Sequence, residues 1–157
     1  MQLKRSYSKI LYSTPIERNG EMKKKAVVYI KSKQSIDDEG IEVVSTGEFE
    51  KTEYGFLVSY EETELSGMEG TTTYLKIFDE KLILQRKGST IAELEFQKGN
   101  NNVSLYDTPY GTLELRVKTN DTIIKINDNG GKIKVDYDIA LSGQKPYKTI
   151  LDVEIKA

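Results

Sequence analysis

The chain has 157 residues, which is enough for one domain with a sizeable hydrophobic core. It contains neither cysteine nor histidine, and this composition excludes disulfide bonds, thiolate or imidazole catalysis, and zinc sites built from those ligands. Hydrophobic residues make up 37% and charged residues 31%, with no apolar run long enough for a membrane-spanning helix, so the composition indicates a globular domain outside the membrane.

The charge is distributed unevenly along the chain. Residues 1–25 hold seven basic and two acidic side chains, whereas residues 26–157 hold 16 basic and 23 acidic ones. An acidic body is unsuited to binding the phosphates of nucleic acids. No secretory or transit signal is visible in the basic segment, so we expect a cytoplasmic protein.

The first 25 residues have no sustained period and are expected to form a poorly ordered basic extension. Met22 is followed by three lysines and then directly by a strand pattern, as an authentic start would be. We therefore expect residues 1–21 to contribute little to stability.

From Ala26 onward the hydrophobic pattern has a period of two, which is typical of half-buried β-strands. Gly, Pro, Asn and Asp separate the segments at short and nearly regular intervals. About ten or eleven strands are predicted, over residues 26–35, 41–51, 54–64, 71–78, 81–87, 90–97, 102–107, 112–118, 122–127, 133–141 and 147–155.

So many antiparallel strands without helices between them must either close on themselves or leave two long edges exposed. We therefore predict an all-β, up-and-down β-barrel over residues 26–157, with a two-sheet sandwich as the second choice. The predicted core consists of Val28, Ile30, Val58, Leu75, Ile77, Leu84, Leu113, Leu115, Ile133, Val135, Ile139, Leu151 and Val153.

Several short motifs in the middle of the chain occur together in a specific order. They are Val58-Ser59-Tyr60-Glu61-Glu62 followed by Gly67, Thr73 with Lys76-Ile77, Arg86-Lys87-Gly88, and the turn Tyr106-Asp107-Thr108-Pro109-Tyr110-Gly111. With these motifs in this order, residues 26–157 resemble the bacterial YwiB-like family, also called domain of unknown function 1934. Residues 1–21 lie outside the resemblance. The resemblance implies a calycin-like, or lipocalin-like, β-barrel, and it implies no particular activity.

Two residues of opposite charge are predicted to face the interior of the barrel. The inward face of residues 54–64 continues to Glu62, and the face that carries Leu82 and Leu84 continues to Arg86, whereas Arg116 faces outward. A charge inside a barrel is costly unless it is paired, and the guanidinium fork suits a carboxylate. The sequence is thus compatible with a structural ion pair that fills the lumen, or with a ligand site.

Four further residues are candidates for contacting a ligand. Tyr60 and Tyr137 are predicted to face inward, Thr73 offers a hydroxyl, and Tyr110 stands at a turn where it could cover the mouth of the barrel. Each also has a simple structural interpretation as a strand or turn residue. The Asp128-Asn129-Gly130 segment lacks the spaced oxygen ligands of a calcium loop and is better explained as a hairpin.

We therefore predict a non-catalytic barrel that binds a small apolar, amphiphilic or carboxylate-bearing ligand, with no catalytic residue, cofactor or metal, and with no nucleic-acid or membrane partner. A regulatory or protein-interaction barrel is the first alternative. The second alternative is an enzyme that uses Glu62 as acid or base. The sequence leaves the oligomeric state open.

Overall fold

The computed structural model describes residues 23–35 and 39–157. Residues 1–22, including the part of the chain predicted to be dispensable, lie outside the described residues. The described chain forms ten strands and one short 3-10 helix: β2 (Lys23–Gln34), β3 (Ile41–Lys51), β4 (Phe56–Glu61), η2 (Glu64–Ser66), β5 (Thr71–Ile77), β6 (Lys81–Gly88), β7 (Ala92–Gln97), β8 (Asn101–Thr108), β9 (Gly111–Asn127), β10 (Gly130–Leu141) and β11 (Tyr147–Lys156).

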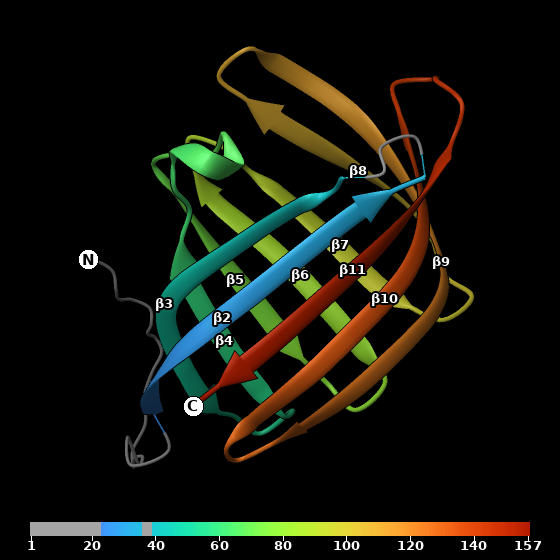
Figure 1. Cartoon of the computed structure of the whole chain (residues 1–157). Coiled ribbons are helices and arrows are strands. Elements are labelled where there is room, and N and C mark those ends of the chain that lie inside the picture. Colours follow the sequence, from blue (N-terminus) through green and yellow to red (C-terminus); the bar gives the residue numbers. More distant parts are fainter. Residues whose placement is uncertain (1–22, 36–38) are drawn as a thin grey trace.

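The strands form one antiparallel sheet that wraps around into a nearly closed up-and-down barrel, as predicted. Strands that are consecutive in the sequence pair with each other, except β7 and β8, and β2 pairs with β11 to join the first and last strands of the described chain. In Figure 1, β3, β2, β11, β10 and β9 form the wall nearer the viewer, and β4 to β7 form the far wall. The helix η2 lies at one end of the barrel, which we call the upper end.

The first strand of the barrel begins at Lys23, three residues before the predicted start of the domain at Ala26. Lys23, Lys24 and Lys25 continue the ladder between β2 and β3. The side chain of Lys23 also forms an ion pair with Glu48 on β3, at 3.3 Å. The three lysines thus belong to the barrel and not to the basic extension, because β3 supplies both backbone partners and a carboxylate.

The predicted turn at Asn120 and Asp121 is a β-bulge. A single strand, β9, spans residues predicted as two strands, and its register with β10 shifts between Asp136 and Tyr137. Asp136 pairs with Asp121 and Tyr137 with Thr119, which leaves Asn120 as the extra residue. The Asn120 amide donates a hydrogen bond to the Asp136 carboxylate at 3.2 Å, so polar residues that resemble a turn instead stabilise a bulge.

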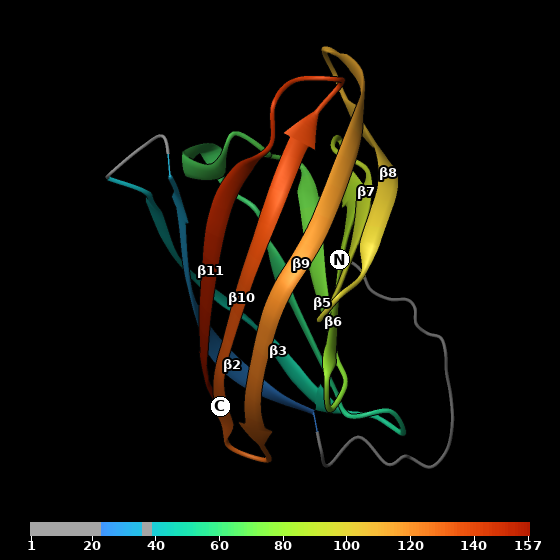
Figure 2. The ribbon, with the colours of Figure 1, turned by 90° about the vertical axis from the view of Figure 1, so that its right-hand side faces the viewer.

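The barrel is incomplete between β7 and β8, a region that we call the seam. Among the described residues, the backbones of the two segments meet in one isolated bridge between Ile91 and Asp107. Below it, Asn102 and Ser104 each donate a side-chain hydrogen bond of 2.8 Å to a backbone carbonyl of β7. Figure 2 shows β7 and β8 beside each other in the turned view. Side chains therefore complete the wall where the ladder is missing.

The core lies inside the barrel and matches the prediction except at one position. Ile30 and Ile139 are partly buried, and Leu113 has 38% of its surface exposed, whereas the other predicted core residues are buried. Leu113 lies near the start of β9, opposite Tyr106, close to the turn at the upper end. Strand alternation placed it on the correct face, but few neighbours remain to cover it at the rim.

Candidate functional site

A cavity of about 190 Å³ lies within the barrel. Its walls come from inward-facing side chains of β2 to β7, β10 and β11, and from the segment around η2. The lining residues are Ile30, Ser32, Ile41, Val43, Tyr60, Glu62, Ser66, Met68, Leu75, Leu84, Arg86, Leu94, Phe96, Tyr137, Leu151 and Val153. Most of them are aliphatic or aromatic, and the two charged ones are Glu62 and Arg86. Four of the six predicted ligand residues thus meet at one cavity.

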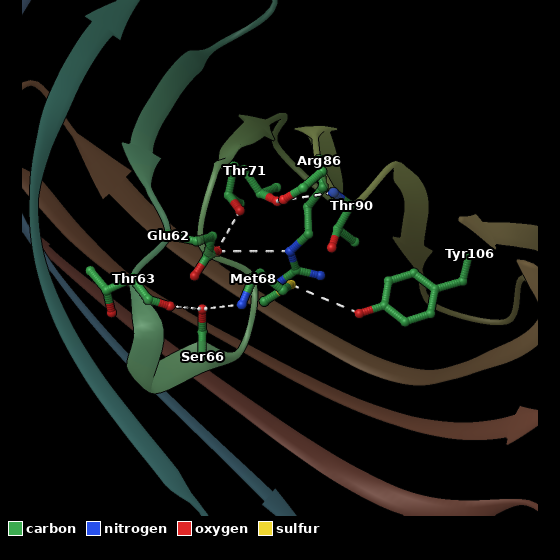
Figure 3. Close-up of polar contacts among 10 residues, drawn as sticks. Glu62, Thr63, Ser66, Met68, Thr71, Arg86, Thr90 and Tyr106 are labelled. Atoms are coloured by element: carbon green, nitrogen blue, oxygen red, sulfur yellow. Dashed lines mark hydrogen bonds and ion pairs between the residues drawn. The ribbon is translucent and has the colours of Figure 1, made fainter. Parts of the chain in front are cut away.

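Glu62 and Arg86 form an ion pair inside the barrel, as one of the two sequence interpretations required (Figure 3). The Arg86 Nε atom lies 3.8 Å from the Glu62 Oε2 atom, and the side chains are only 17% and 3% exposed, respectively. The same Oε2 atom accepts a hydrogen bond of 2.5 Å from the Thr73 hydroxyl. At 3.8 Å the Arg86 Nε–H group makes no hydrogen bond to the carboxylate, and Nε has no other acceptor among the described residues.

The local strand geometry explains why the two charges meet. Glu62 follows the last residue of β4, and its backbone N–H donates to the carbonyl of Thr71 on β5 at 2.8 Å. Arg86 lies on β6 directly opposite Thr73 of β5. Because β5 lies between β4 and β6, the two side chains approach each other across the inner face of three adjacent strands.

The phenol groups of Tyr60 and Tyr137 line the same cavity and are held in their neutral form. Burial raises the pKa of Tyr60, as does the negative charge of Glu62, while Arg86 opposes the increase. Burial also raises the pKa of Tyr137, to about 12, and the Arg86 charge again lowers it in part. Both groups are therefore hydrogen-bonding partners and not charges at physiological pH.

The buried Tyr137 makes the stability sensitive to alkaline pH. A raised pKa in the folded state means that its contribution to stability is complete below pH 10.0, the ordinary value, and is lost as the pH rises toward about 12. Replacing Tyr137 with phenylalanine, which keeps the ring beside Phe96, should make this alkaline loss of stability smaller. Urea unfolding at pH values across this interval measures the effect, and equal losses in both proteins would contradict the assignment.

The other two predicted ligand residues are placed differently. Thr73 is fully buried and positions Glu62, but it is not among the residues that line the cavity. Tyr110 is 98% exposed in the turn between β8 and β9, and it does not line the cavity. The structure therefore does not bring Tyr110 to the site, because the turn holds its side chain in solvent.

The segment between β4 and β5 contributes two lining residues, Ser66 and Met68, that the sequence analysis missed. The short helix η2 ends at Ser66, and the next residue, Gly67, has a φ of 76°, which lies in the left-handed region that favours glycine. The Ser66 hydroxyl donates to the carbonyl of Thr63 at 3.0 Å, and the Met68 sulfur accepts from the Tyr106 hydroxyl at 3.8 Å (Figure 3). In the sequence this segment is only the gap between the predicted strands 54–64 and 71–78, and no periodic pattern indicates which of its side chains enter the cavity.

A second hollow, of about 500 Å³, lies on the outer side of the wall formed by β2, β3, β9, β10 and β11. Outward-facing side chains of both charges line it, including Lys31, Glu42, Lys134 and Asp152. None of the predicted ligand residues lies there. The cavity inside the barrel is therefore the candidate site.

The comparison with known families agrees with this architecture. Residues 16–153 match the family described as a domain of unknown function, DUF1934. The chain belongs to this family. The match begins at residue 16, so residues 16–21, which we expected to lie outside the family resemblance, fall within the DUF1934 region.

One relative of this chain is the uncharacterized β-barrel protein YwiB of Bacillus subtilis (strain 168). It is 24% identical to this chain over 131 residues, which cover 80% of this chain and 90% of the relative. The crystal structure of the ywiB protein from Bacillus subtilis superposes with a TM-score of 0.77 at 19% identity, covering 87% of this chain and 94% of that chain. This likeness shows a shared barrel fold and assigns no activity to either protein.

Proposed function

We propose that this barrel binds a small molecule in its inner cavity without transforming it. In this proposal Arg86 holds an anionic group of the ligand, such as a carboxylate, and the apolar walls hold the remainder. The supporting observation is the buried Nε–H group of Arg86, which has no hydrogen-bond acceptor among the described residues. A buried donor without a partner is costly, so a ligand that supplies an acceptor gains free energy on binding.

The geometry of the ion pair supports this use of Arg86. A carboxylate that saturates an arginine forms two parallel hydrogen bonds at short distance. Glu62 makes a single, longer contact of 3.8 Å and uses the same oxygen atom for Thr73. The guanidinium fork therefore keeps the capacity to bind a second carboxylate in a bidentate manner.

The size of the cavity limits the ligand. Typical ligand pockets measure roughly 300–1,000 Å³, while an engineered apolar cavity of roughly 150 Å³ holds one benzene molecule. At about 190 Å³, the cavity lies between these values and near the lower one. A long acyl chain does not fit this volume, so the proposal is restricted to a short or single-ring ligand.

Native mass spectrometry of protein purified from cells tests the proposal. We expect a small adduct on the wild-type protein and on an Arg116→Met variant. Arg116 is the matched control because it lies on the outer face of the barrel, where it pairs with Glu114 at 3.4 Å. We expect its loss from an Arg86→Lys variant, which keeps the charge but not the planar fork. An adduct that persists in Arg86→Lys, or its absence from the wild type, would contradict the proposal.

A further inference from the structure

Glu62 and Arg86 present opposite charges to one small cavity. Both line it, and their nearest charged atoms are 3.8 Å apart, so the site as a whole is electrically neutral. A simple anion bound at Arg86 would lie close to the Glu62 carboxylate and be repelled by it. A simple cation bound at Glu62 would be repelled by Arg86 in the same way. A ligand that carries both charges avoids both repulsions.

Both protein charges have hydrogen-bonding capacity left for such a ligand. Glu62 accepts a hydrogen bond from Thr73 through Oε2 and interacts with the Tyr60 hydroxyl, whereas a carboxylate offers about four lone-pair sites. Arg86 has a buried Nε–H group without an acceptor. An ammonium group has three donors for Glu62, and a carboxylate can accept two hydrogen bonds from the Arg86 fork.

The remaining walls fit a compact apolar side chain. Leu75, Leu84 and Leu151 line the cavity, together with the ring of Phe96. Scaled from the cavity that holds benzene, a volume of about 190 Å³ accommodates about eight non-hydrogen atoms. Branched aliphatic amino acids are of this size.

From these three observations we infer that the ligand is a small zwitterion, namely a free amino acid with a branched apolar side chain. Its carboxylate is bound by Arg86, its ammonium group by Glu62, and its side chain by the leucine-lined wall. This inference rests on the proposed function and specifies the class of ligand for the same site.

Three molecules of matched shape test the inference on the wild-type protein. Leucine carries both charges, isocaproate lacks the amino group, and isoamylamine lacks the carboxylate. Isothermal titration calorimetry should show that leucine binds at least about tenfold more tightly than either analogue, since each analogue leaves one protein charge without its partner. Equal or weaker binding of leucine relative to isocaproate would overturn the inference.

Variants of the two charged residues give a second test. Glu62→Gln keeps the shape of the side chain and removes its charge, so leucine should lose its advantage over isocaproate in this variant. Arg86→Lys should weaken the binding of both leucine and isocaproate. Arg116→Met should leave the affinities for all three molecules unchanged. Leucine binding that survives both Glu62→Gln and Arg86→Lys would overturn the assignment of the two charges.

The outcomes separate the inference from the proposed function. If isocaproate binds more tightly than leucine and the binding depends on Arg86, the cavity is a carboxylate site and only the zwitterion is excluded. If none of the three molecules binds and the purified protein carries no adduct, both the inference and the proposed function fail. The wild-type titrations remain decisive even where a variant does not fold.

Discussion

Replacing Arg86 with methionine is expected to lower the free energy of unfolding by about 3 kcal/mol at neutral pH. The variant leaves the Glu62 carboxylate, which is only 3% exposed, without its counter-charge. The hydrogen bond from Thr73 remains, so the loss should lie at the lower end of the range for a broken buried ion pair. Urea unfolding monitored by circular dichroism measures the effect.

The matching double variant distinguishes a charge effect from a packing effect. With Glu62→Leu and Arg86→Met together, no unpaired charge remains, and stability should return to within about 1 kcal/mol of the wild type. Arg116→Met breaks an exposed ion pair with Glu114 and should cost less than about 0.5 kcal/mol. The loss in the free energy of unfolding of the double variant is compared with the sum of the losses of the single variants Glu62→Leu and Arg86→Met. If the two values are equal, the two residues are not coupled and the ion pair has no energetic role.

Replacing Phe49 with alanine is expected to cost about 3–5 kcal/mol. Phe49 is fully buried, and its ring stacks on that of Phe56 with centroids 5.0 Å apart. The truncation leaves an apolar cavity, so the surrounding side chains lose contacts that they cannot easily replace. Thermal and urea unfolding of the variant give the magnitude.

Val44→Ala is the control on the same strand, because Val44 is exposed on the outer face and should lose no more than about 0.5 kcal/mol. A cost below about 1 kcal/mol for Phe49→Ala would mean that the interior around Phe49 is not closely packed. That result would leave the ion pair, and not the aromatic core, as the main stabilising element of the lumen.

The barrel and the position of its internal charges could be predicted because strand alternation is a strictly local property. Glu62 and Arg86 each continue an apolar face with a period of two, and the structure places both inside. The order of the strands followed from the absence of helical segments between them. That the two charges lie close together required one further fact, the pairing of β5 with both neighbours.

The parts of the site that could not be predicted lie where the chain has no period. Ser66 and Met68 follow β4 in a short turn, and which of its side chains enter the cavity depends on tertiary packing. Tyr110 was assigned to the site from its place in a turn, and its turn directs it to solvent. Asn120 and Asp121 have turn-forming side chains, but tertiary pairing with β10 kept the strand continuous through a bulge.

At the seam, the separation between β7 and β8 depends on side chains. Elsewhere the distance between neighbouring strands is fixed by backbone hydrogen bonds, which no substitution of a side chain can lengthen. At the seam, the side chains of Asn102 and Ser104 set the separation through their contacts with carbonyl groups of β7. Between the Ile91–Asp107 bridge and the turn that joins β7 to β8, a longer or shorter residue at either position would therefore change the local separation of the two strands without breaking a ladder. Leu94 and Phe96 of β7 also line the cavity, so a change in the side chains of the seam also changes the position of one wall of the cavity.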